Sequence, residues 1–135
     1  MQILAFDFGT QHIGVAVGQT ITKTSSPLTI LNVAREGKEI WNIISNLIDE
    51  WKPDRLLVGK PLNMDGTPSD MMKKVDPFFQ KLQKISNIPC ELVDERLTSF
   101  EAKQLMQTDS KYDRIDDLAA KIFLDNWIEH HVNSN

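Results

Sequence analysis

Residue kinds that mark secreted or membrane-spanning proteins are scarce in this sequence. The 135 residues include one cysteine, Cys90, so an internal disulfide is excluded and a reducing compartment is expected. No apolar run approaches the roughly 20 residues of a membrane span, and no basic segment leads into an apolar one at the N-terminus. Positive charge does not dominate either, because 15 Lys and Arg against 19 Asp and Glu give a formal net charge of -4. We therefore expect a cytoplasmic protein with no membrane segment and no broad basic surface.

The rest of the composition is that of a globular domain. Hydrophobic residues make up 41% and charged residues 25% of the chain, which is enough to build one core unaided. The sequence has no internal repeat, no low-complexity tract and no segment with the composition of a linker. Residues 1–135 are accordingly expected to form a single domain.

Short apolar runs and amphipathic stretches together predict a mixed α/β fold. Five runs have the length and composition of strands: 3–8, 13–17, 28–33, 55–59 and 89–95. Helical spacing of apolar residues predicts helices at 40–51, from 67 onward, at 98–107 and at 115–130. Pro77 falls inside the second helix, so a kink or two abutting helices are expected there. This order indicates three antiparallel strands and then two parallel ones, with helices on both faces of the sheet.

Asp7 is the first candidate for chemistry. It lies in the apolar segment LAFDFGT, residues 4–10, and is followed closely by Gly9 and Thr10. A glycine beside a polar turn lets the backbone approach an anion or a metal closely. A metal-dependent nuclease and a nucleotide-binding ATPase both place an aspartate in this way. A hydrogen-bonded structural carboxylate at a strand end is the third interpretation.

A pair of acids, Asp94 and Glu95, ends the predicted fifth strand. Because successive side chains of a strand point to opposite faces, only one of the two can face a given site. The plainer alternative is that they favour the dipole of the helix that follows.

A second pair, Asp116 and Asp117, opens the last predicted helix. Asp116 shares a helix face with Ala119 and Ala120, small residues that would let the helix lie close to a sheet. Asp117 is rotated about 100° away and is expected in solvent. A cap favoured by the helix dipole is again the plainer alternative.

Taken together, Asp7, one of the two strand-end acids and Asp116 would meet at one edge of a sheet covered on both faces. Such carboxylates repel one another unless a divalent cation neutralises them, and hard oxygen ligands select Mg²⁺ or Mn²⁺ rather than zinc. Two such ions about 4 Å apart can activate a water and stabilise the leaving oxygen of a phosphodiester. The 3 histidines do not predict a zinc site, because His12 stands alone in a predicted turn and the others lie in the C-terminal tail.

At these residues the sequence resembles the YqgF/RuvX family, ribonuclease H-like relatives of the RuvC Holliday-junction resolvases that are described as resolvases or as pre-16S rRNA nucleases. Five motifs carry the resemblance along nearly the whole chain, in the order and about the spacing of the family: DFGTQHIGVAVG, SSPLTIL, GKPLNMDGT, VDERLTSFEA and IDDLAAKIFL. The resemblance implies a ribonuclease H-like fold, a mixed five-stranded sheet flanked by helices, and metal-dependent cleavage of nucleic acid.

The resemblance also implies roles for particular residues. The catalytic and metal-binding carboxylates would be Asp7, Glu95 and Asp116, with Asp94 as the rival of Glu95, and the cofactor would be Mg²⁺ or Mn²⁺. Contacts to the nucleic acid would come from Thr10, Lys60, Asn63, Arg96 and Arg114. The segment before the last helix, SKYDRID, is less basic than is usual in the family, which weakens the expected grip on a phosphate backbone.

Two alternatives to a nuclease remain open from the sequence. An actin-like ATPase domain uses the same D-x-G-T turn, but it needs two lobes, and the 135 residues hold no second such turn. A non-catalytic ribonuclease H-like partner in ribosome assembly or transcription would have the same fold, although retention of all three acids argues against it. The expected partner is nucleic acid, either an RNA precursor or branched DNA, and the chain is expected to be a monomer or a homodimer.

Overall fold

A mixed five-stranded sheet lies at the centre of the molecule. The computed structural model describes residues 1–8, 11–61, 65, 67, 69–94 and 115–133. The strand order is β3-β2-β1-β4-β5. The strands are β1 (Gln2–Phe8), β2 (His12–Gln19), β3 (Thr24–Asn32), β4 (Arg55–Lys60) and β5 (Cys90–Asp94). The first three are antiparallel neighbours, and β4 and β5 run parallel to β1, so the predicted topology is confirmed.

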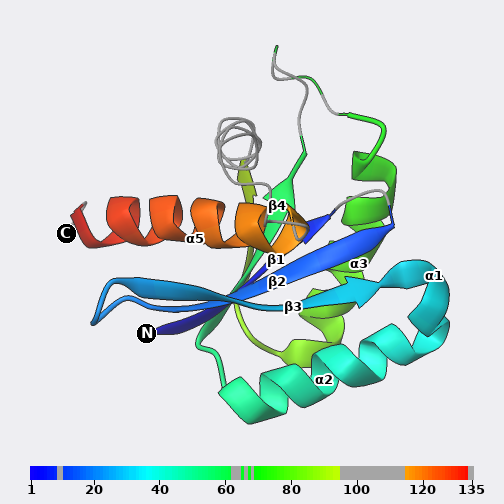
Figure 1. Cartoon of the computed structure of the whole chain (residues 1–135), viewed down its shortest axis with the longest axis horizontal. Helices are drawn as coiled ribbons and strands as arrows, with labels where there is room; N and C mark the ends of the chain where they lie inside the picture. Colours follow the sequence, from blue (N-terminus) through cyan, green and yellow to red (C-terminus); the bar gives the residue numbers. More distant parts are fainter. Residues whose placement is uncertain (9–10, 62–64, 66, 68, 95–114, 134–135) are drawn as a thin grey trace.

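Helices cover both faces of this sheet (Figure 1). The helices α2 (Ile40–Trp51) and α3 (Met72–Ser86) pack on one face, and α5 (Ile115–Asn133) packs on the other. Alternation along β1 divides the core in the same way, because Leu4 and Phe6 join the cluster of α2 and α3 whereas Ile3 and Ala5 join the cluster of α5. We call these two sides of the sheet the α3 face and the α5 face.

Small residues on β2 allow α5 to lie close to the sheet. Gly14, Ala16 and Gly18 alternate along the α5 face of this strand. A Cβ atom added at Gly18 would come within 2.9 Å of side-chain atoms of both Leu124 and Ile128. The motif GVAVG therefore has a packing role at its second glycine.

The third strand starts earlier than the sequence predicts. β3 begins at Thr24 and includes Pro27, both inside a stretch that the polar residues indicate as a turn. Proline is tolerated there because β3 is an edge strand, and because the register with β2 shifts between Val15 and Ala16, the latter pairing with Pro27.

The helices also differ from expectation in detail. α3 is one helix with Pro77 inside it, not two abutting helices. The strand expected to end at residue 33 ends at Asn32, which caps a short helix, α1 (Val33–Glu36), followed by the 3-10 turn η1 (Gly37–Glu39). The helix predicted at 98–107 lies outside the described residues. Among the helices that are described, none is long and apolar enough to cross a membrane.

Candidate active site

Asp7 is the buried charged side chain of the described core. Its exposed fraction is 4%, and it is the next-to-last residue of β1. Alternation from Ile3 and Ala5 places it on the α5 face. A buried carboxylate needs hydrogen-bond donors or a cation around it. Asp7 is therefore a carboxylate that is costly to bury, and it lies at a strand end, where a ligand can approach it.

Glycines flank Asp7 on both neighbouring strands. Asp7 pairs with Gly14 across the antiparallel ladder to β2. On the other side, Phe6 pairs with Val58 in β4, so the next step of the parallel register brings Gly59 beside Asp7. Neither glycine has a side chain to occupy the α5 face next to the carboxylate.

Lys60 and Asp94 stand at the same edge of the sheet as Asp7 but on the other face. They pair with each other at the carboxyl ends of β4 and β5. Their alternation follows Val58 and Leu92, which pack in the core of the α3 face. Asp94 therefore does not share a face with Asp7. The alternative that Asp94 serves as the metal ligand in place of Glu95 is not supported.

The first turn of α5, which contains Asp116, lies near the end of the sheet at which Asp7 lies. Leu124 touches Gly18, and α5 and β2 run in the same direction, with the orange end of α5 near the carboxyl end of β1 (Figure 1). Eight residues of helix separate Asp116 from Leu124, about 12 Å of rise. Four residues of strand separate Gly14 from Gly18, about 13 Å. The two lengths agree, so the first turn of α5 reaches about as far along the sheet as Gly14. The side chain of Asp116 is not among those that the structure describes.

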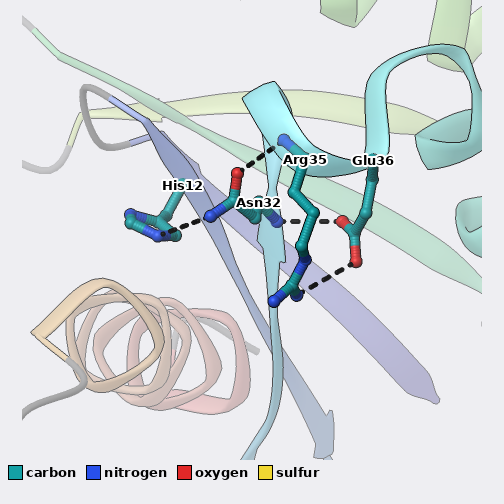
Figure 2. Close-up of polar contacts among 4 residues, drawn as sticks. All are labelled: His12, Asn32, Arg35 and Glu36. Carbon is teal, nitrogen blue, oxygen red and sulfur yellow. Dashed lines mark hydrogen bonds and ion pairs between the residues drawn. The ribbon is translucent and has the colours of Figure 1, made fainter.

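His12 lies at this edge, in a strand and not in the turn that the sequence predicts. It is the first residue of β2, and alternation from Gly14 and Ala16 puts it on the α5 face. Its Nε2 atom lies 3.3 Å from Nδ2 of Asn32, the last residue of β3 (Figure 2). The sequence gives one indication that His12 lies near Asp7, its spacing of two residues from Gly14. This spacing can be interpreted only when the pairing of Asp7 with Gly14 is known.

Several predicted site residues lie outside the described residues, and their roles stay predictions: Thr10, Asn63, Glu95, Arg96 and Arg114. In the loop after β4, the backbone N–H and the hydroxyl of Thr67 donate to Asp65 Oδ1 at 3.0 and 2.6 Å. Within the part of the chain whose side chains are described, no three His, Cys, Asp or Glu residues gather as a metal site.

Solved structures with the same architecture define the class of fold. Thermus thermophilus RuvC in complex with a Holliday junction has a TM-score of 0.61 at 12% identity, covering 99% of this chain and 97% of that one. The fowlpox virus Holliday junction resolvase has a TM-score of 0.59 at 14% identity, covering 96% of this chain and 99% of that one. At identities this low the likeness shows the fold alone, which is the ribonuclease H-like fold of these resolvases.

Sequence comparison gives the family. Residues 1–130 match the model of RuvX, described as Holliday junction resolvase, and the chain belongs to this family. A Saccharophagus degradans protein is 41% identical over 134 residues, covering 96% of this chain and 94% of its own. A Pseudomonas fluorescens protein is 47% identical over 136 residues, covering 96% and 93%. Both are named "Putative pre-16S rRNA nuclease", so the resemblance is confirmed and the expected nuclease class agrees with these names.

Proposed function

We propose that this chain is a metal-dependent nuclease that hydrolyses phosphodiester bonds in the precursor of 16S ribosomal RNA. The observation that carries the proposal is the placement of Asp7: a buried carboxylate at the carboxyl end of β1, on the α5 face, paired with Gly14 of β2. The choice of RNA follows the names of relatives that are 41% and 47% identical over nearly the whole chain. Such a substrate would place the protein in the cytoplasm.

The proposed ligands of a Mg²⁺ or Mn²⁺ ion are Asp7, Glu95 and Asp116. Asp7 fits this role, because its carboxylate offers hard oxygens and Gly14 and Gly59 add no side chain beside it. Asp94 falls on the α3 face and is therefore not proposed as a ligand, so Glu95, the acid that the resemblance to the family implies, is kept for this role. For Asp116, the matching spans of α5 and β2 support a place near Asp7. When bound, a hard divalent cation supplies charge neutralisation and Lewis acidity for the attack of water on a phosphodiester.

In this reaction the protein's own residues hold the carboxylate ligands in place and orient the substrate. Burial within a packed strand fixes the Asp7 carboxylate, so little reorganisation is needed when a phosphodiester arrives. With a net charge of -4, the protein is proposed to grip its substrate through local contacts, one of them from Lys60, which lies at the same sheet edge as Asp7 but on the α3 face, so its contact would be with a part of the substrate away from the Asp7 carboxylate. The remaining proposed substrate contacts are Thr10, Asn63, Arg96 and Arg114. The protein would act as a monomer or a homodimer.

A cleavage assay with Mn²⁺ on three substrates tests the proposal: a fragment spanning the 5′ end of the 16S precursor, a four-way DNA junction and an unstructured single strand. The proposal predicts cleavage, with preference for the precursor fragment. Preference for the junction would contradict the substrate and support branched DNA. Absence of cleavage of all three would favour the non-catalytic alternative, a partner in ribosome assembly or transcription.

A further inference from the structure

The helix α3 is basic in an acidic protein. It contains four lysines and one acid, Asp76, whereas the whole chain has a formal net charge of -4. With 3.6 residues in each helical turn, the four lysines fall within an arc of about 100°. The buried residues Met72, Val75 and Leu82 lie on the other side of the helix, in the core of the α3 face. The lysines are all exposed, and we call them the α3 lysines: Lys73, Lys74, Lys81 and Lys84.

The α3 lysines form no ion pair with the residues that the structure describes. The ion pairs among those residues are Arg35–Glu36, Arg55–Glu91 and Lys121–Asp125. Lys81 has a different contact, because its Nζ atom lies 4.6 Å from the ring centroid of Trp41. A cation over an aromatic ring keeps its charge. The α3 lysines therefore present positive charge that the described residues do not neutralise.

Helix stability does not account for this arrangement. Lys73 and Lys74 lie in the first turn of α3, which contains no acidic residue. The helix dipole disfavours cations at this end and favours anions. Two lysines placed there weaken the helix slightly, but they add to its attraction for a negatively charged ligand.

The α3 lysines begin at the end of the sheet where Asp7 lies. The strands β4 and β5 are parallel and α3 connects them, so α3 starts at the carboxyl end of β4 and runs back along the sheet (Figure 1). Lys60, the last residue of β4, lies on the α3 face at that same end. Lys73 follows in the first turn of α3, and Lys84 lies about 16 Å further along the helix axis. Positive charge therefore extends from the edge of the proposed nuclease site along the outer side of α3.

We propose that the α3 lysines bind the phosphate backbone of the substrate RNA beyond the Asp7 site and continue the contact that Lys60 begins. A phosphate backbone fits this surface, because it carries negative charges at close, regular intervals that several lysines can meet at once. The ammonium group of lysine is a point charge on a flexible stem, so it contacts phosphates without reading the base sequence. The inference rests on the proposed function, which supplies the RNA.

The salt dependence of RNA binding tests the proposal, because it measures how many phosphates a protein neutralises. The variant combines Lys73→Gln with Lys84→Gln and is compared with the unsubstituted protein on a 16S-precursor RNA fragment in Ca²⁺. Each lost phosphate contact should make the slope of log K against log salt shallower by about 0.7 to 0.9, or about 1.4 to 1.8 for both. Affinity at about 0.1 M salt should fall on the order of tenfold, and the loss should fade as the salt concentration rises. Glutamine is a good helix former, so the fold should persist by circular dichroism.

The matched control combines Lys23→Gln with Lys52→Gln. These lysines are also exposed, but they lie in the turn after β2 and just after α2, at the other end of the sheet. The control removes the same charge and should leave the slope unchanged. Asp76→Asn removes the acid of α3 and should have the opposite effect to the double lysine variant, binding more tightly. A scrambled RNA of the same length should lose as much affinity as the precursor fragment, because phosphate contacts do not depend on sequence.

The possible outcomes separate this inference from the proposed function. If the double lysine variant binds with an unchanged slope and affinity while the unsubstituted protein cleaves RNA, the inference is wrong and the proposed nuclease stands. The α3 lysines would then serve an acidic protein partner or face solvent. If the control lowers the slope as much as the double lysine variant, binding follows overall charge and the inference is again wrong. If the protein binds RNA through the α3 lysines but does not cleave it, the inference stands and the nuclease is wrong. If the unsubstituted protein binds no nucleic acid, both fail.

Discussion

Asp7 of β1 and Gly14 of β2 face each other across the antiparallel ladder, on the side of the sheet that α5 covers. The pairing gives the motif D-F-G-T…G a structural meaning, because the glycine that faces the carboxylate comes from the strand after the turn. Further along the same strand, Gly18 serves the packing of α5. The two glycines of GVAVG are thus expected to respond differently to the same substitution.

Gly14→Ala should impair activity more than stability. The added methyl group would stand opposite Asp7, with the two Cβ atoms about 4.5 to 5.5 Å apart. We expect cleavage to fall about tenfold through restricted access to the carboxylate, measured at a temperature at which circular dichroism shows the variant to be folded. Unchanged cleavage by a folded Gly14→Ala protein would show that the space beside Asp7 is not used.

Gly18→Ala should do the reverse. Its Cβ would meet Ile128 Cδ1 and Leu124 Cδ2 at 2.9 Å, and overpacking of this kind costs about 1 to 3 kcal/mol. Urea unfolding should show a loss of unfolding free energy in that range. Adding Ile128→Val, which removes one of the two atoms, should restore part of the loss. A Gly18→Ala protein as stable as the original would mean that α5 can move away at no cost.

Binding of Mg²⁺ should stabilise the folded protein through Asp7. For a dissociation constant on the order of 1 mM, about 10 mM Mg²⁺ adds roughly 1.4 kcal/mol to the unfolding free energy, or a few degrees in the melting temperature. Asp7→Asn should melt at the same temperature with Mg²⁺ as with EDTA. If Asp7 is a structural carboxylate instead, Asp7→Asn should be destabilised and Mg²⁺ should shift neither protein.

Cys90 should react slowly with alkylating reagents. Burial raises the pKa of its thiol above the ordinary value, and the hydrogen bond with Ser86, at 3.8 Å, opposes the rise. Since the thiolate is the reactive form, the midpoint of the pH dependence of iodoacetamide labelling should lie above that of the urea-unfolded chain. Ser86→Ala removes the opposing hydrogen bond and should raise the midpoint further; a lower midpoint in that variant would contradict this assignment.

Much of the sheet could be predicted because its inner strands are short buried runs. Leu56, Leu57 and Val58 are fully buried, and such runs between a helix and a turn are typical of central parallel strands. The start of β3 could not be predicted, because Ser25, Ser26 and Pro27 carry no strand signal. An edge strand is defined there by backbone pairing with β2, which side-chain patterns do not record.

Of the candidate site, the sequence indicated the aspartate but not its surroundings. Asp7 stood out because a charge inside an apolar run is costly to bury. The relation between Asp94 and the site depended on the register of β5 with β4, which alternation alone leaves open by one residue. His12 was missed because its partner, Asn32, is 20 residues away in the chain, and no local pattern marks such a contact.

If Asp7 is a catalytic metal ligand, Asp7→Asn should lose RNA cleavage in Mn²⁺, and the rate of that cleavage is the quantity to measure. The matched control is Asp49→Asn, an exposed acid on α2, on the opposite face of the sheet. We expect Asp7→Asn to lose at least about a hundredfold in rate while keeping its fold by circular dichroism, and Asp49→Asn to cleave normally. Cleavage by purified Asp7→Asn at the rate of the unsubstituted protein would show that Asp7 is not a catalytic metal ligand.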